Sequence, residues 1–211
     1  GNVLVQANSL AAAGAIYFRN TGTLTIEPIA NSFTSALSWP LTNINLVSTA
    51  GLTIGKSTNT ADITIASATS VAGPITIYGG AININAALTA SGSNTITLSG
   101  SGNVTDGASG YVVASNLLIL GGNVTLDNNT NNAIGTLAAS GVSGFTYADK
   151  DALTIGTVGS TNGISASGAI NISTYTGDLT ISKQVVTTNT TSSAIILNAA
   201  SNTAAGTSTG G

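Results

Sequence analysis

The carboxyl groups closest together in the sequence belong to Asp149 and Asp151, which flank Lys150. Residues i and i+2 of a β-strand point to the same side, so these carboxylates could stand about 6 to 7 Å apart. Two carboxylates at such a separation can act as acid and nucleophile in glycoside hydrolysis. An Asp-Lys-Asp triplet directly before an aliphatic strand is more typical of a solvated turn. We therefore assign no catalytic residue.

Other chemistry is limited by the residue types that the chain lacks. It has no His and no Cys, which excludes Ser-His-Asp and Cys-His nucleophiles and zinc sites built from these ligands. The stretch from Gly121 to Asp127 begins like a calcium-binding glycine-rich repeat and then departs from it. The next residues, Asn128, Asn129 and Thr130, offer oxygen ligands, but a single carboxylate makes a poor Ca²⁺ site. We predict no metal, no cofactor and no enzymatic activity.

The charge content is far below that of ordinary soluble domains. Only 5% of residues are charged, against about 25% on average, and the net charge is −3. Nucleic acid and anionic membranes require a basic surface, which four scattered positive residues cannot form. The longest apolar run, residues 9–18, is too short to cross a bilayer, and no basic residue precedes it as in a signal peptide. We predict no nucleic-acid partner and no membrane insertion.

The elements that fill the chain are short aliphatic–polar–aliphatic triplets. This period of two predicts β-strands with one aliphatic face and one Thr or Asn face, and Gly, Asn, Asp or Ser bounds each triplet. Examples are Leu52-Thr53-Ile54, Ile63-Thr64-Ile65, Ile75-Thr76-Ile77, Ile82-Asn83-Ile84, Ile96-Thr97-Leu98, Val124-Thr125-Leu126, Leu153-Thr154-Ile155, Ile170-Asn171-Ile172 and Leu179-Thr180-Ile181.

The triplets recur at a nearly constant spacing, with at least two strands in each period. One series runs through Leu52, Ile75, Ile96 and Leu117, and an interleaved series runs through Ile63, Ile82, Val104 and Val124. A meander sandwich has similar strand spacing, but hairpin signals are nearly absent, Asn162-Gly163 being the only Asn-Gly pair. The pattern favours an all-β parallel β-solenoid of about ten coils of about 20 residues.

Three segments depart from the repeat, and they shape the expected domain plan. We predict a single β-solenoid over residues 1–201, with a loop excursion near 27–43, a second irregular corner at 141–151, and a linker or frayed end at 202–211. Because the sequence does not begin with Met and ends in Gly-Gly, we expect a segment of a longer chain or a processed product.

Outward Thr residues and exposed aromatic residues suggest two binding functions. If Thr53, Thr76 and Thr97 stack, they form a Thr array of the kind that orders water, although Asn83, Asn123 and Asn171 interrupt the Thr series along the chain. Aromatic residues, which could bind sugars, are dispersed along the chain: Tyr17, Phe18, Trp39, Tyr78, Tyr111, Tyr147 and Tyr175.

Several repeats resemble those of filamentous-haemagglutinin-like exoproteins, which are large surface adhesins of Gram-negative bacteria often exported by two-partner secretion. The resemblance is carried by residues 122–127, 133–137, 151–158 and 177–181, and is clearest from Leu52 to Asn198. It implies a right-handed parallel β-helix and an extracellular location at the bacterial cell surface. The Asn-Pro-Asn-Gly type motif of the family's secretion domain is absent from this sequence.

These observations predict a structural protein. We expect a shaft or filament segment of a secreted or surface-anchored bacterial adhesin that supports cell adhesion, aggregation or biofilm. The expected partners are further copies, end to end or laterally, and host or neighbouring-cell glycans. The alternatives are an ice-binding or glycan-binding β-solenoid and a polysaccharide-degrading β-helix enzyme.

Overall fold

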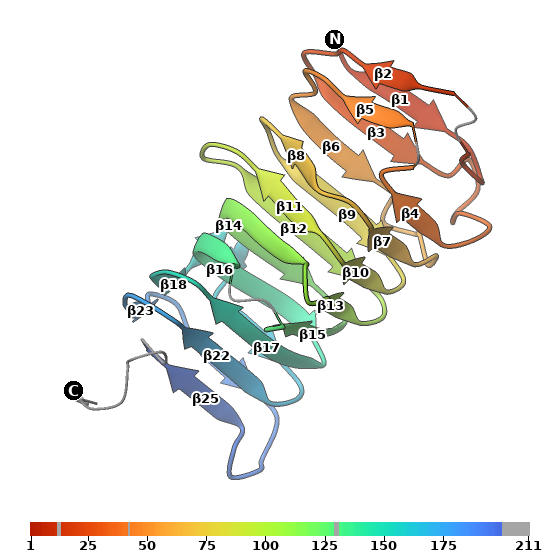
Figure 1. Cartoon of the computed structure of the whole chain (residues 1–211). Helices are drawn as coiled ribbons and strands as arrows, with labels where there is room; N and C mark the ends of the chain where they lie inside the picture. Colours follow the sequence, from red (N-terminus) through yellow and green to blue (C-terminus); the bar gives the residue numbers. More distant parts are fainter. Residues whose placement is uncertain (12–13, 42, 129–130, 200–211) are drawn as a thin grey trace.

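The computed structural model describes residues 1–11, 14–41, 43–128 and 131–199, and within these ranges it contains strands and no helix. The chain winds into a right-handed parallel β-helix of about nine turns, with the N-terminus at one end of the stack and the last strand at the other (Figure 1). No helix in the described ranges could span a membrane. The predicted fold class is confirmed.

The first face of the solenoid is a continuous parallel sheet that contains one strand from each turn. Its inward residues are Leu, Ile and Val, and its outward residues are mostly Thr, Ser and Asn, as strand alternation requires. In stacking order the strands are β1 (Val3–Gln6), β3 (Thr23–Glu27), β6 (Gly51–Ile54), β9 (Ile75–Gly79), β12 (Thr95–Gly100), β14 (Tyr111–Leu120), β16 (Ala133–Val142), β18 (Leu153–Ile155) and β23 (Leu179–Ile181).

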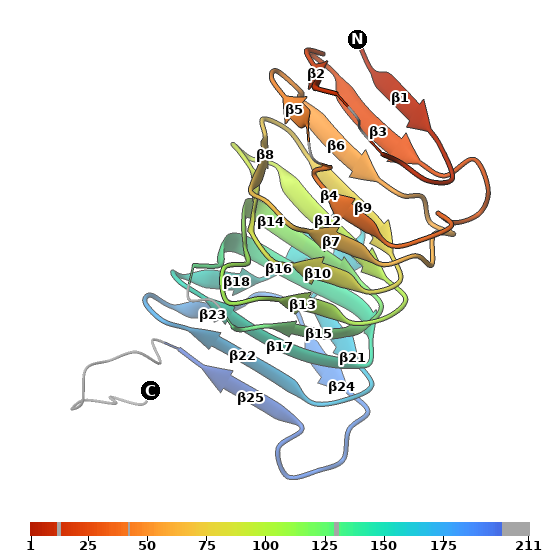
Figure 2. The same cartoon turned by 45° about the vertical axis from the view of Figure 1, so that its right-hand side comes forward.

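The second face is a parallel sheet that begins one turn later. Viewed from the side, its strands lie across the core from the first sheet (Figure 2). In stacking order they are β4 (Leu37–Trp39), β7 (Ile63–Ile65), β10 (Ile82–Ile84), β13 (Val104–Asp106), β15 (Asn123–Leu126), β17 (Gly144–Asp149), β22 (Ile170–Thr174) and β25 (Ile195–Asn198).

Shorter strands complete the turns and form a less regular third face. Here β2 (Ile16–Phe18) pairs with β5 (Ile44–Leu46), and β8 (Thr69–Val71) pairs with β11 (Ala87–Ala90), which continues onto β14. Near the C-terminal end, β21 (Ile164–Ala166) joins β16 to β24 (Val185–Thr187). An antiparallel pair, β19 (Thr157–Val158) with β20 (Thr161–Asn162), forms a hairpin.

The strand register confirms both series of aliphatic residues read from the sequence. Leu52 pairs with Ile75, Ile75 with Ile96, and Ile96 with Leu117 in the first sheet. Ile63 pairs with Ile82, Ile82 with Val104, and Val104 with Val124 in the second. All these residues are fully or almost fully buried, so each column of stacked aliphatic side chains builds the core along the axis.

The number of turns is slightly lower than predicted, because some turns are longer than the predicted period. The two longest steps in the first sheet run from Leu24 to its partner Leu52 and from Ile155 to its partner Ile181. The first step contains the connection from β3 to β4, and the second contains the hairpin and a longer third face. With about 4.8 Å between neighbouring strands, about nine turns give a rod roughly 40 Å long.

Two of the segments that departed from the repeat contain regular strands of the solenoid. Within 27–43, Leu37–Trp39 is the first strand of the second sheet, and Phe33 and Trp39 lie in the core. The predicted irregular corner at 141–151 is wrong, because Gly144–Asp149 is strand β17. Aromatic Phe145 and Tyr147 replace aliphatic residues in its inward positions, which hid the repeat. The predicted linker at 202–211 lies outside the described residues.

Candidate functional site

The carboxylates of Asp149 and Asp151 do not share a surface. Asp149 is completely buried, whereas Asp151 is exposed at the following corner. The alternative of two carboxylates on one side of a strand is therefore excluded, and the predicted solvated turn is correct for Asp151 but wrong for Asp149. The strand ends at Asp149, and the chain then turns toward β18.

Asp149 stabilises the corner that follows strand β17. Its Oδ2 accepts hydrogen bonds from the Tyr147 hydroxyl (2.7 Å) and the Ile134 N–H (3.0 Å), and its Oδ1 accepts one from the Asp151 N–H (2.9 Å). Burial raises the pKa of this carboxyl group to about 6, although these hydrogen bonds oppose the shift. Burial also raises the pKa of Tyr147 well above its ordinary value, as does the nearby carboxylate of Asp149.

A buried asparagine connects the same corner to the neighbouring turns. Asn132 accepts a hydrogen bond from the Val112 N–H (2.9 Å) and donates to the carbonyl oxygens of Leu126 (3.1 Å) and Ala148 (3.2 Å). These three partners belong to three different strands, β14, β15 and β17. Asn132 thus satisfies backbone groups of three strands that would otherwise lack partners at a buried corner.

Asp106 ends strand β13, two strands before β17, and occupies an inward position in register with Ile84. Its Oδ1 accepts a hydrogen bond from the Asn128 N–H (3.2 Å), while Oδ2 is buried without a hydrogen-bond partner among the described residues. Burial raises the pKa of this carboxyl group, and the charge of Asp127 adds to the shift. A raised pKa favours the neutral acid, which lowers the cost of burying the group.

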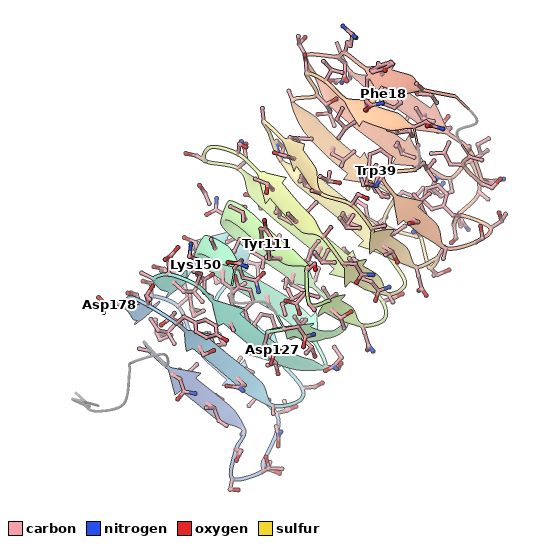
Figure 3. The ribbon with its side chains drawn as sticks, viewed as in Figure 1. Phe18, Trp39, Tyr111, Asp127, Lys150 and Asp178 are labelled. Atoms are coloured by element: carbon pink, nitrogen blue, oxygen red, sulfur yellow. The ribbon has the colours of Figure 1, made fainter. Side chains whose placement is uncertain are left out.

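These buried carboxyl groups do not form a site that a substrate could reach. Among the described residues, no three His, Cys, Asp or Glu side chains group together in a way that could hold a metal ion. Asp127, Lys150 and Asp178 lie at separate places on the rod (Figure 3). Asn129 and Thr130, considered as calcium ligands, lie outside the described residues. The buried carboxyl groups of Asp106 and Asp149 accept hydrogen bonds from backbone N–H groups and so stabilise corners of the solenoid.

The glycines that resembled the start of a calcium repeat have a steric role. Gly121 and Gly122 have φ angles of 77° and 81°, in the left-handed region that favours glycine. A Cβ atom on Gly122 would collide with the carbonyl oxygen of Gly102 in the turn below. The corner between the first and second sheets therefore requires glycine at this point.

The outward side of the second sheet carries a column of uncharged polar residues, which we call the second-sheet polar column. Asn83 joins two of its neighbours, because its Nδ2 lies 3.5 Å from Oγ1 of Thr64 and its Oδ1 accepts a hydrogen bond from the Thr105 hydroxyl at 3.1 Å. The stacked residues, in register from turn to turn, are Ser38, Thr64, Asn83, Thr105, Thr125, Thr146 and Asn171.

The first sheet carries a shorter Thr column. The predicted stacking of Thr53, Thr76 and Thr97 is confirmed, and Thr25 extends the column by one turn. Leu4 and Leu118 hold the same position in the turns beyond its two ends. Asn83, Asn123 and Asn171 do not interrupt this column, because they belong to strands of the second sheet. Thr25 was missed, although Leu24-Thr25-Ile26 has the same triplet pattern.

The hairpin covers the first sheet beyond the Thr column. It is inserted between β18 and β21, two short strands that pair with β16. Strand β19 contacts both β14 and β16. Val158 of the hairpin is buried, and so is Ala138, although Ala138 shares the outward position of Leu118. The hairpin therefore shields apolar outward residues that would otherwise face water.

The aromatic residues form no shared platform within the described part of the chain. Trp39 and Tyr147 are buried in the core, whereas Tyr17 is exposed near the N-terminal end with the Arg19 guanidinium 5.5 Å from its ring centre. Phe18 and Trp39 lie in the N-terminal part of the rod, and Tyr111 lies further along it (Figure 3). Sugar binding through stacked aromatic rings has no support in this arrangement.

Comparison of the chain with protein-family models, with curated proteins and with solved structures found no match in any of the three. The function is therefore inferred from the geometry of the solenoid and from its outward columns.

Proposed function

We propose that this chain is a rigid shaft or filament segment of a filamentous-haemagglutinin-like adhesin at the bacterial cell surface, where it supports adhesion, aggregation or biofilm. The observation that supports this proposal most directly is the unbroken parallel ladder of the first sheet, in which strands of about nine turns pair in succession.

A ladder of this kind suits a mechanical role. Each turn is hydrogen-bonded to the next and shares aliphatic core columns with it, so the molecule is stiff along its axis. The second-sheet polar column carries no charge, and stacked like charges would repel at strand spacing. Extension of the rod by further turns meets no electrostatic penalty on that face.

The proposed partners follow from the same surface. Uncharged hydroxyl and amide groups can hydrogen-bond to neutral glycans or to the sides of neighbouring rods. Self-association, end to end or laterally, would produce fibres from such rods.

Immunogold electron microscopy of the native source, with an antibody raised against this chain, tests the proposal. Label along thin surface fibres is the expected result, and pre-immune serum is the control. Label confined to dispersed soluble particles would overturn the shaft role.

Ice binding is a second candidate, because Thr25, Thr53, Thr76 and Thr97 stack in consecutive turns on one face. Inhibition of ice recrystallisation by the purified chain is the test. If the column is responsible, Thr76→Leu should reduce inhibition strongly, whereas Thr105→Leu on the second sheet should leave it unchanged. A chain without measurable inhibition would remove this candidate.

A further inference from the structure

The third face of the solenoid is interrupted between two consecutive turns. Within the part of the chain that the structure describes, β5 pairs only with β2, whereas β8 pairs with β11. No hydrogen bond joins β5 to β8 in these ranges, although the other two faces of the same turns are paired, β3 with β6 and β4 with β7. Strands β2 and β5 lie side by side, and β8 and β11 are the next pair along the rod (Figure 1). Because β2 flanks the interruption on one side and β11 on the other, it belongs to the side of the rod.

A groove occupies the gap between β5 and β8. Two hollows of about 210 and 280 Å³ adjoin each other along it, and Leu46 and Ser70 line both. Most Cα atoms of β5 lie more than 8 Å from those of β8, whereas paired strands are about 4.8 Å apart. One additional strand, paired on both sides, needs a gap of about 9.6 Å. The width of the groove is therefore that of a single extended chain.

The unpaired edge of β5 faces this groove. The Asn43 carbonyl oxygen accepts a hydrogen bond from the Ile16 N–H (2.8 Å). The Val47 N–H donates to the Phe18 carbonyl oxygen (2.9 Å). Alternate residues of a parallel strand bond to the same neighbour, so the backbone groups of Asn43 and Val47 point toward β2. Those of Leu46 point the other way, into the groove.

The opposite wall has the same property. The Val71 carbonyl oxygen accepts a hydrogen bond from the Ser91 N–H (3.0 Å), so the backbone groups of Val71 point toward β11. By the same alternation the N–H and C=O of Ser70 point into the groove. Leu46 and Ser70 thus present open backbone donors and acceptors from its two walls, at the point where the two hollows meet.

The groove lacks the features that normally protect strand edges. Charged residues and prolines usually prevent an open edge from pairing, and residues 44–48 and 68–72 contain neither. Val47, on the lining, is 49% exposed. Open backbone groups, an exposed aliphatic side chain and the absence of charge suit an uncharged extended peptide. A neutral glycan fits the absence of charge equally well, but it does not match the two-residue repeat of strand edges.

We propose that this groove binds one extended, uncharged peptide segment of a partner protein, which inserts as an additional strand between β5 and β8. In strand addition, main-chain hydrogen bonds provide affinity and alternate side chains provide specificity. The inward side chains of the segment would lie between Leu46 and Val71, so aliphatic residues at alternate positions are favoured. The inference goes beyond the shaft role, and its test does not depend on filament formation.

Fluorescence polarisation with the full chain and a labelled peptide tests the proposal. The peptide copies residues 86–91, Ala-Ala-Leu-Thr-Ala-Ser, because this uncharged segment contains β11, which pairs with the other edge of β8. Saturable binding with a dissociation constant below about 1 mM is expected. The same peptide methylated on its backbone nitrogens has lost its donors and should bind at least about tenfold more weakly.

Two substitutions at one position locate the binding. Ser70→Pro removes the N–H from the groove wall, at an unpaired edge where proline is tolerated, and should weaken binding at least about fivefold. The matched control Ser70→Ala keeps the N–H and loses only the hydroxyl group, so its affinity should stay within about twofold of the original. Circular dichroism shows whether Ser70→Pro folds; if it does not, the methylated peptide decides.

Four results would overturn the proposal. They are no binding of the peptide up to about 1 mM, equal binding of the methylated peptide, equal loss of affinity in Ser70→Ala and Ser70→Pro, and unchanged affinity in a folded Ser70→Pro. The last would place the peptide on another strand edge of the rod. Displacement of the peptide by the neutral oligosaccharide cellohexaose would identify the groove as a glycan site instead.

Discussion

A few buried polar side chains carry much of the specificity of this fold, because the corners of each turn bring backbone groups out of reach of water. Asn132 and Asp149 act together at one such corner, where they bond to backbone groups of β14, β15, β16 and β17. Unpaired backbone groups in such a place are costly, so single substitutions there should have large effects.

Asn132→Ala is expected to destabilise the protein strongly. It leaves the Val112 N–H and the carbonyl groups of Leu126 and Ala148 without their side-chain partner, at about 1 to 3 kcal/mol for each group. We expect the free energy of unfolding in urea to fall by at least about 3 kcal/mol. The control Asn171→Ala, at an exposed outward position, should change it by less than about 0.5 kcal/mol. Similar values for the two variants would contradict the role of Asn132.

The raised pKa of Asp149 predicts an unusual dependence of stability on pH. Its pKa is about 6 in the folded protein and 3.8 for an ordinary Asp, so the folded chain binds this proton more tightly than the unfolded chain. Stability should therefore rise as pH falls from about 7 to about 4, by at most about 3 kcal/mol. The raised pKa of Asp106 acts in the same direction.

Urea unfolding between pH 4.5 and pH 7.5 measures this slope. Asp149→Asn should flatten it, leaving only the part due to Asp106, whereas Asp178→Asn at an exposed position should leave it unchanged. A wild-type protein that is less stable at pH 5 than at pH 7 would show that Asp149 is not the dominant titrating group.

At the scale of elements, the solenoid tolerates insertions wherever the strands on both sides keep their register. The hairpin of β19 and β20 illustrates this, because β18 and β21 pair with β16 on one side and with β23 and β24 on the other. In the next turn only the short segment 182–184 occupies the corresponding gap. The hairpin is therefore an addition to the sheet, and its packing role is local.

Replacing residues 156–163 with Ser-Lys-Gln, the sequence of 182–184, should preserve the fold. Loss of the Val158 contact and exposure of Ala138 should lower the free energy of unfolding by about 1 to 2 kcal/mol, with an unchanged far-ultraviolet circular dichroism spectrum. Val158→Ser, which keeps the hairpin, should account for most of this loss. Disappearance of the β spectrum in the shortened variant would show that the hairpin is needed for folding.

At the scale of the whole molecule, stability should vary along the axis. Turns in the middle of the rod are paired on both sides, whereas the first and last turns are paired on one side only. In repeat architectures each turn gains stability from its neighbours, so the ends open at lower free energy than the middle.

Hydrogen exchange measured by mass spectrometry should show this gradient. Amides of β1 and of β23 to β25 should exchange fastest, and those of β9 to β15 slowest. Uniform protection along the rod would contradict the gradient.

The sequence by itself determined the repeat, the inward and outward residues of most strands and the register between turns. This was possible because residues one sequence period apart occupy equivalent positions in neighbouring turns. The period along the chain therefore identifies which residues are in contact. It also indicated correctly that Thr53, Thr76 and Thr97 stack. The family, the location and the partners drawn from resemblance stay predictions.

Only the tertiary structure decided the features that depend on contacts outside the repeat. Asp149 and Asp151 separate because the strand ends at Asp149; the Asp-Lys-Asp triplet indicated a turn here, but no local pattern showed that Asp149 is buried. Asn83 and Thr76 belong to different sheets. The spacing of the triplets along the sequence does not show which sheet a triplet joins. The burial of Ala138 depends on a hairpin that the following turn contributes.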